Sequence, residues 1–125
     1  MKLRPWMMSV LALSITLADA SRGRAGSLES GKAVFARCAS CHSTRPGQNG
    51  VGPSLFGVIG RRAGTAPGFR YSSAMTAFGR VWDPGLVSAY LADPKTVVPG
   101  NKMTFPGLKS AQDRDNIAAY LSSLK

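Results

Sequence analysis

Cys38-Ala39-Ser40-Cys41-His42 is the most informative stretch of this 125-residue chain. Two cysteines separated by two residues and followed at once by a histidine form the pattern of covalent c-type haem attachment. Residues three apart in a helical turn share one face, so both thiols can bond to the two vinyl groups of one porphyrin. The imidazole of His42 then falls beneath the ring, where it can bind the iron. The motif predicts one covalently attached haem c, held by Cys38 and Cys41, with His42 as an axial ligand.

Three other interpretations of the two cysteines are weaker. A structural zinc site normally takes four Cys or His ligands, and the whole sequence holds two Cys and one His. A redox-active Cys-x-x-Cys would need a βαβ context, and no convincing strand precedes Cys38. A plain structural disulfide between Cys38 and Cys41 remains open.

The N-terminus has the pattern of a secretory signal. Lys2 and Arg4 form a basic end, residues 6–17 are apolar, and Ala18-Asp19-Ala20 offers a small-x-small cleavage site. The apolar stretch is shorter than the about 20 residues that a membrane-spanning helix needs. We therefore expect residues 1–20 to be a signal peptide that is removed on export to the periplasm. The alternative is an uncleaved N-terminal membrane anchor, which two arginines just after the site slightly favour.

The charge indicates the chemistry of the partner. The full chain carries a net charge of +10, and removal of residues 1–20 would leave 105 residues with a net charge of +9. We expect residues 21–26 to be a flexible leader and residues 27–125 to form a single domain, small enough that a large apolar cofactor would supply part of its core. The positive charge predicts an acidic partner. Nucleic acid is not expected, because the protein is exported and lacks a Lys/Arg-rich block.

Capping residues and hydrophobic spacing predict an all-α fold with four to five helices. Ser27 is a good N-cap for a first helix, with Phe35 and Cys38 at helical spacing from its start. A short helix should cover residues 74–78. Asp83-Pro84 should begin a further helix that ends at Asp93-Pro94, and Ser110 should cap the last one. No stretch has a convincing strand pattern.

Long loops should complete the fold. Residues 43–68 are rich in glycine and proline, and a loop of that length is uncommon unless it is functional; wrapping a haem edge would justify it. Ile117 begins an apolar stripe at i, i+3, i+4 and i+7 on the last helix, which needs a packing partner. The face of the first helix that carries Gly31 and Phe35 is the candidate, although Gly31 could equally be a glycine that the helix simply tolerates.

The second axial ligand is expected to be a methionine, because the chain has no second histidine. Only Met75 and Met103 follow the predicted signal peptide. Met103 lies between turn residues in Pro99-Gly100-Asn101-Lys102-Met103-Thr104-Phe105-Pro106, where prolines limit helix formation and a core packing role is hard to explain. Met75 falls in a short amphipathic helix, where filling a gap in the core is the expected role. We therefore favour Met103.

The chain resembles the class I cytochromes c, of the bacterial cytochrome c2 and mitochondrial cytochrome c type. The resemblance extends from Gly31 to the C-terminus. The matching segments are Gly31-Lys32-x-x-Phe35-x-x-Cys38-x-x-Cys41-His42, Val51-Gly52-Pro53-x-Leu55-x-Gly57, Gly60-Arg61, Ala66-Pro67-Gly68-Phe69-x-Tyr71, Trp82, Tyr90-Leu91-x-Asp93-Pro94-Lys95, Pro99-Gly100-x-Lys102-Met103-x-Phe105 and Ala119-Tyr120-Leu121. Met75 is a departure, since mitochondrial relatives usually carry a polar Asn at this position.

The resemblance implies a role for each matched position. Cys38 and Cys41 would bind the haem through thioethers, and His42 and Met103 would be the axial ligands, the combination typical of cytochromes c. The Pro53 carbonyl would accept the N–H of His42. The remaining implied haem contacts are Arg61, Tyr71 and Trp82 at the propionates, Tyr90 near the Met sulfur and Phe105 as a shield of the ring. A ring of partner-binding charges would comprise Arg37, Lys95, Lys102 and Lys109.

The function that this resemblance implies is electron transfer without catalysis. A monohaem, monomeric carrier would shuttle single electrons between respiratory or photosynthetic membrane complexes in the periplasm. Its partners would present acidic docking surfaces, on a bc1-type complex, a cytochrome oxidase, a reaction centre or a periplasmic dehydrogenase or reductase. One alternative is a haem peroxidase or gas sensor in which Met103 dissociates, and carbon monoxide binding to the native ferrous protein would support it. The other is a thiol–disulfide oxidoreductase that uses Cys38 and Cys41.

Overall fold

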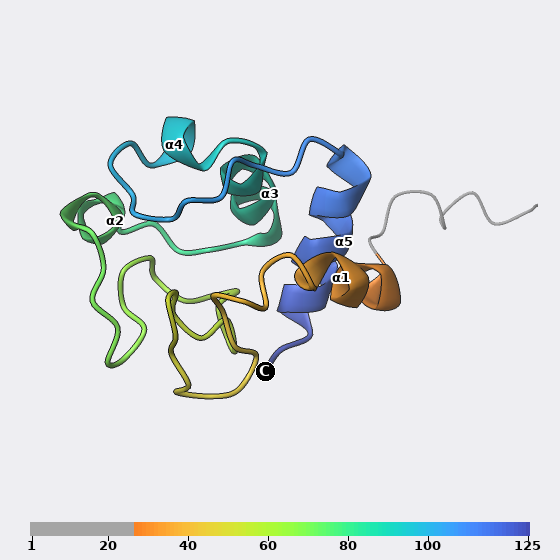
Figure 1. The fold of residues 1–125 in the computed structure, drawn as a ribbon, viewed down its shortest axis with the longest axis horizontal. Helices are drawn as coiled ribbons and strands as arrows, with labels where there is room; N and C mark the ends of the chain where they lie inside the picture. Colours follow the sequence, from red (N-terminus) through yellow and green to blue (C-terminus); the bar gives the residue numbers. More distant parts are fainter. Residues whose placement is uncertain (1–26) are drawn as a thin grey trace, which may run out of the picture.

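The computed structural model describes residues 27–125, which form five helices joined by long loops (Figure 1). The helices are α1 (Leu28–Phe35), α2 (Ser73–Phe78), α3 (Pro84–Ala92), α4 (Pro94–Val97) and α5 (Ala111–Ser122). Within the described residues the only extended pairing is an isolated antiparallel bridge between Arg62 and Val81. The predicted all-α fold with four to five helices is confirmed. The predicted signal peptide (1–20) and leader (21–26) lie outside the described residues.

Helices α1, α3 and α5 begin where the sequence predicts N-caps, and α2 has a cap of the same kind. The side chains of Ser27, Ser72, Asp83 and Ser110 each accept a hydrogen bond from a backbone N–H in the first turn of the following helix. This interaction satisfies one of the donors that a helix N-terminus leaves unpaired. Helix α4 was not predicted, because the sequence interpretation ended the preceding helix at Asp93-Pro94 and proposed no further helix before the one capped by Ser110.

Helices α1 and α5 cross in direct contact (Figure 1). A Cβ atom placed on Gly31 would lie 2.1 Å from the backbone oxygen of Asn116 and 2.6 Å from Cβ of Tyr120. Only a residue without a side chain lets the two backbones approach this closely. The Phe35 and Tyr120 rings pack nearby with their centroids 5.6 Å apart. The predicted pairing of the first and last helices is therefore confirmed, and close approach explains Gly31.

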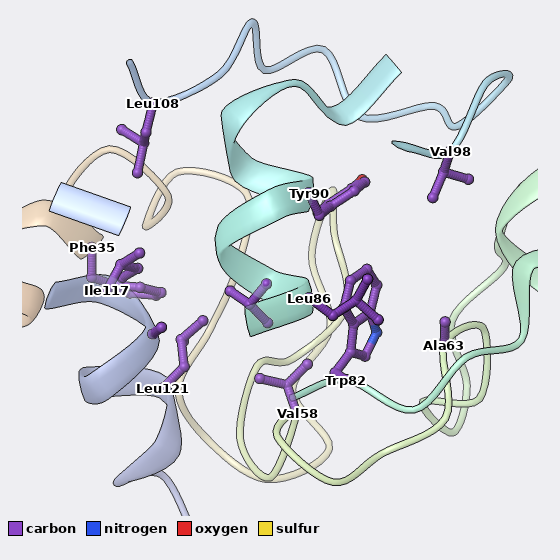
Figure 2. Packing of buried hydrophobic residues seen from close by; sticks show 12 residues of the cluster. Phe35, Val58, Ala63, Trp82, Leu86, Tyr90, Val98, Leu108, Ile117 and Leu121 are labelled. Carbon is purple, nitrogen blue, oxygen red and sulfur yellow. The ribbon is translucent and has the colours of Figure 1, made fainter. Parts of the chain in front are cut away.

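The core extends from this helix pair towards α3 and the loops (Figure 2). Leu108 and Ile117 are each 1% exposed. Trp82 packs against Tyr90 of α3 with ring centroids 5.1 Å apart, and against Phe78 of α2 at 5.8 Å. The Trp82 contacts join α2 to α3, and α3 also packs against α5, around the site described next. Among residues 27–125, no helix is long and apolar enough to cross a membrane.

Candidate functional site

A largely apolar cavity of about 420 Å³ lies between the loops and helices α2, α3 and α5. This volume falls in the range of about 300–1,000 Å³ that is usual for cofactor sites. Every residue predicted to bind the haem or the haem iron lines this cavity. Arg37 and Lys102, two of the predicted docking charges, line it as well. Those haem-site residues are Cys38, Cys41, His42, Pro53, Arg61, Tyr71, Trp82, Tyr90, Met103 and Phe105. Segments spread over residues 37–121 thus converge on one cavity.

The cysteines lie in helical turns that continue from α1. The backbone N–H of Cys41 donates to the carbonyl of Cys38 at 3.1 Å, and that of His42 donates to the same carbonyl at 2.9 Å. These bonds place both sulfurs and the imidazole at the cavity wall. Both cysteines are free, so the structure contains no disulfide between them. Burial, together with the neighbouring Cys41, raises the pKa of the Cys38 thiol. A thiol–disulfide oxidoreductase needs the opposite shift in its nucleophile.

The imidazole of His42 is held in one tautomer. Its Nδ1 lies 2.7 Å from the carbonyl oxygen of Pro53, and because a carbonyl can only accept, Nδ1 carries the proton. The Nε2 lone pair is then available for a metal. Burial lowers the pKa of His42, and the nearby Arg61 charge adds to this, against the Pro53 hydrogen bond, which raises it. The neutral ring that a metal requires is favoured. Gly52 allows this placement, because a Cβ there would lie 2.3 Å from Cε1 of His42.

Two polar residues that the sequence interpretation missed hold the Pro53 loop. Ser54 is 3% exposed, and its hydroxyl donates to the Arg45 carbonyl at 2.5 Å. Asn49 accepts from the backbone N–H of Ser54 at 2.9 Å and donates to the Pro67 carbonyl, also at 2.9 Å. These side chains fix the position of the carbonyl that orients His42. No spacing rule reveals them, because each bond depends on the path of an irregular loop.

Met103 lies on an extended segment at the cavity wall. Burial alternates along it: Asn101, Met103 and Phe105 are partly buried, whereas the residues between them are exposed. An extended chain places alternate side chains on one face, so Met103 and Phe105 face the interior together. Met75 of α2 also lines the cavity, so the second thioether of the described domain is close to the same space. The expected role of Met75 as simple core filling is therefore incomplete.

The polar groups at the cavity suit a carboxylate-bearing ligand. Arg61 donates to the carbonyls of Phe56 (3.3 Å) and Ser54 (3.0 Å), while its Nε is buried and has no partner among the described residues. A buried N–H without an acceptor is costly, and a haem propionate would supply one. The hydroxyl of Tyr71 accepts from the backbone N–H of Ala66 at 3.0 Å, which leaves its own proton to donate. With the thiols, the imidazole and the apolar wall, these groups fit a haem.

Three aromatic side chains form much of the cavity wall. Trp82 and Tyr90 are both 8% exposed, and Phe105 is partly buried. Burial raises the pKa of Tyr90 to about 12, so its hydroxyl stays protonated throughout the physiological range. These rings give the flat apolar surfaces against which a porphyrin could stack.

The four predicted docking charges differ in their surroundings. Arg37 is exposed at the cavity rim, whereas Lys95 and Lys109 are exposed on segments outside the lining. Lys102 is exposed overall, but its Nζ donates to the carbonyl of Arg70 and lies 5.0 Å from the centroid of the Phe69 ring. One of its three protons is thus used within the protein. Lys95 and Lys109 have no such contact among the described hydrogen bonds.

An all-helical domain that closes on an apolar cavity, with a Cys-x-x-Cys-His turn on its wall, is the architecture of a c-type cytochrome. The sequence matches the family Cytochrome c over residues 28–125. It is 53% identical to cytochrome c2 of Rhodoblastus acidophilus over 102 residues, which cover 81% of this chain and 95% of that protein. It is 45% identical to cytochrome c of Euglena viridis over 101 residues, which cover 80% and 99%.

Among solved structures, cytochrome cH from Methylobacterium extorquens matches with a TM-score of 0.75 and 43% sequence identity, covering 78% of this chain and 99% of that one. The chain belongs to the cytochrome c family. It carries one covalently attached haem c and functions as a monohaem electron-transfer carrier. Its relatives are electron-transfer cytochromes, which are not enzymes in the usual sense.

Proposed function

We propose that this protein is a periplasmic electron carrier in which Cys38 and Cys41 hold the haem, while His42 and Met103 bind its iron. The observation that carries the proposal is the hydrogen bond from His42 Nδ1 to the Pro53 carbonyl, 2.7 Å long, since it leaves Nε2 free to bind a metal in the cavity. Partners of this kind orient ligating histidines and increase their basicity.

The remaining cavity residues would tune and seal the site. The haem supplies an iron that changes between the ferric and ferrous states. As a ligand, the soft thioether of Met103 would favour the ferrous state and raise the potential, and the apolar wall would act in the same direction by disfavouring the extra positive charge of the ferric state. Arg61, Tyr71 and Trp82 would contact the propionates, while Tyr90 and Phe105 would exclude water. If His42 and Met103 both bound the iron, small substrates would find no open coordination site, which supports a carrier and not an enzyme.

We further propose that residues 1–20 are a signal peptide cleaved after Ala20, that 21–26 form a leader, and that 27–125 are the functional domain. The basic start, the short apolar stretch and the Ala-x-Ala site support cleavage, and relatives named cytochrome c2 support a periplasmic location. An uncleaved anchor is the alternative. Intact mass measurement of protein recovered from periplasm would distinguish a chain that begins at Ser21 from one that begins at Met1.

Docking would use four exposed positive charges, two of which line the cavity. Arg37, Lys95, Lys102 and Lys109 are the proposed contacts for acidic surfaces on a bc1-type complex, a cytochrome oxidase, a reaction centre or a periplasmic dehydrogenase or reductase. The protein would act as a monomer, because redox encounters use small and transient interfaces, below about 1,200 Å². Charge then sets the encounter rate, with on-rates up to about 10⁸–10⁹ M⁻¹s⁻¹ at low salt.

Charge reversal tests the docking proposal. Lys95→Glu and Lys109→Glu should each slow electron transfer to an acidic partner and flatten its dependence on salt. Lys32→Glu is the matched control, because Lys32 is also an exposed lysine but is not one of the four proposed contacts. The measurement is the second-order rate constant over a range of ionic strength. Equal effects of all three variants would indicate a general charge effect and contradict the proposed surface.

A pair of methionine variants tests the axial ligand. Met103→Ala should convert the ferric haem from low spin to high spin or to water ligation, and should lower its potential. Met75→Ala is the matched control and should keep the low-spin spectrum, because it removes a cavity thioether that is not the proposed ligand. Low-spin thioether ligation that survives in Met103→Ala and disappears in Met75→Ala would overturn the assignment.

A further inference from the structure

The backbone around Met103 makes few hydrogen bonds to the rest of the backbone. In the described part of the chain, no N–H or carbonyl of residues 102–107 takes part in a backbone–backbone hydrogen bond. The adjoining bonds are those from Asn101 N to the Val98 carbonyl (3.1 Å) and from Leu108 N to the Leu91 carbonyl (2.7 Å). An extended segment anchored only at its two ends has several accessible conformations, and ordering it costs entropy. A ligand on such a segment needs support from side chains.

The side chain of Asn101 provides that support. Its Nδ2 donates to the carbonyls of Pro94 (3.0 Å) and Val98 (2.9 Å), and its Oδ1 accepts from the backbone N–H of Met103 at 2.9 Å. Both amide hydrogens and one oxygen lone pair are therefore used. The three partners are backbone groups, which cannot rotate away as a side chain can.

The anchoring end of this bridge is rigid. Pro94 begins α4 and is among the most deeply buried side chains of the described domain, and Val98 just after α4 is 2% exposed. The Val98 N–H also bonds to the Pro94 carbonyl at 3.0 Å, so the two carbonyls that receive Asn101 are fixed relative to each other. Asn101 therefore holds the backbone of Met103 in a fixed position relative to α4.

We propose that Asn101 is a positioning residue for the iron ligand: its amide clamps the Met103 backbone to α4 and so keeps the thioether on the iron. The proposal rests on the assignment of Met103 as the axial ligand. Partners that orient a metal ligand are worth about 10–100-fold in metal affinity. Loss of the clamp should therefore increase the fraction of molecules in which Met103 has left the iron by about the same factor.

The experiment measures how readily added imidazole replaces Met103 in the ferric, haem-loaded protein. Replacement is followed by loss of the far-red charge-transfer band of iron–thioether ligation. Asn101→Ala should bind imidazole about 10–100-fold more tightly than the wild type, because apparent affinity scales with the fraction of open molecules. Asn101→Asp keeps an oxygen for the Met103 N–H but loses both donors to α4, so it should behave like Asn101→Ala.

Asn116→Ala is the matched control. Asn116 is also a buried amide with more than one hydrogen bond, since its Oδ1 accepts from the backbone N–H of Ser27 at 3.0 Å and from Gln112 Nε2 at 3.1 Å, but it does not line the cavity. It should lower the stability against denaturant by an amount similar to Asn101→Ala and leave imidazole affinity unchanged. If Asn101→Ala and Asn116→Ala change imidazole affinity equally, or if Asn101→Asp binds imidazole like the wild type, the proposed role of Asn101 is refuted. Absence of the thioether band in the wild type would instead refute Met103 as the ligand.

Discussion

Replacing Gly31 with alanine should destabilise the protein strongly, although alanine is the better helix former. The new Cβ would lie 2.1 Å from the backbone oxygen of Asn116, 2.8 Å from its carbonyl carbon and 2.6 Å from Cβ of Tyr120. Two of these three atoms belong to the backbone of α5, so relief requires the two helices to separate. Overpacking of this kind costs about 1–3 kcal/mol, and contact with backbone favours the upper end.

The gain in helix propensity offsets part of this cost. Alanine in a helix interior is favoured over glycine by about 1 kcal/mol, so the expected net loss of unfolding free energy is about 2 kcal/mol. This corresponds to about a 30-fold shift in the folding equilibrium and to a fall in Tm of about 8–16 °C for a domain of this size. Gly85→Ala is the matched control on α3, because its Cβ would meet only Asp83 Oδ1, at 3.4 Å.

Guanidinium unfolding of the haem-loaded variants, followed by far-UV circular dichroism, provides the measurement. Gly85→Ala should leave the free energy of unfolding unchanged or raise it by up to about 1 kcal/mol. Gly31→Ala with a stability within about 0.5 kcal/mol of the wild type would refute the reasoning, because α1 and α5 would then not depend on close backbone approach at this point.

Three further predictions concern the cavity. Gly52→Ala should tilt the His42 ring away from Pro53, because its Cβ would lie 2.3 Å from His42 Cε1; a high-spin fraction in the ferric absorption spectrum is expected, and a fully low-spin spectrum would contradict it. Arg61→Leu should lower the midpoint potential by about 30–60 mV, since a nearby cation disfavours the ferric state. Arg61→Lys keeps the positive charge and should have a midpoint potential close to that of the wild type. Equal potentials in both variants would argue against a charge effect. Because burial raises the pKa of Tyr90 to about 12 from about 10 in an unfolded chain, ionisation favours the unfolded state between these values. The contribution of Tyr90 to stability is then complete below about pH 10 and is lost as the pH rises towards 12. The free energy of unfolding of the ferrous protein, measured with denaturant, should fall less between about pH 9 and about pH 11 in Tyr90→Phe than in the wild type. An identical fall in both proteins would exclude Tyr90 as its source.

Local signals in the sequence predicted most of the helices. N-caps act within three residues of the helix start, so Ser27, Asp83 and Ser110 could be recognised without knowledge of the fold. Helix α4 carries the same signal, an Asp93 cap followed by Pro94 at the first helical position. It was missed because four residues are too few to display hydrophobic periodicity.

The part of the site that a local sequence motif forms was predictable, whereas the part that depends on tertiary contacts was not. The spacing of the Cys-x-x-Cys-His run is by itself enough to indicate covalent haem attachment. Asn101 and Ser54 were missed because their importance arises from backbone groups that irregular loops bring within reach. Lys102 was interpreted only as a docking charge, whereas its ammonium group bonds to the carbonyl of Arg70, 32 residues away. Pairings this distant in sequence have no local pattern.

The central claim is that one covalent haem with His42 and Met103 as ligands makes this protein a one-electron carrier. The most direct test is a spectroscopic redox titration of protein matured in a periplasm with haem attachment active. We expect a haem that stays bound after denaturation, a low-spin spectrum in both oxidation states, and a single reversible one-electron wave well above zero on the hydrogen scale. A high-spin haem, a negative midpoint potential or a protein without covalent haem would contradict the claim.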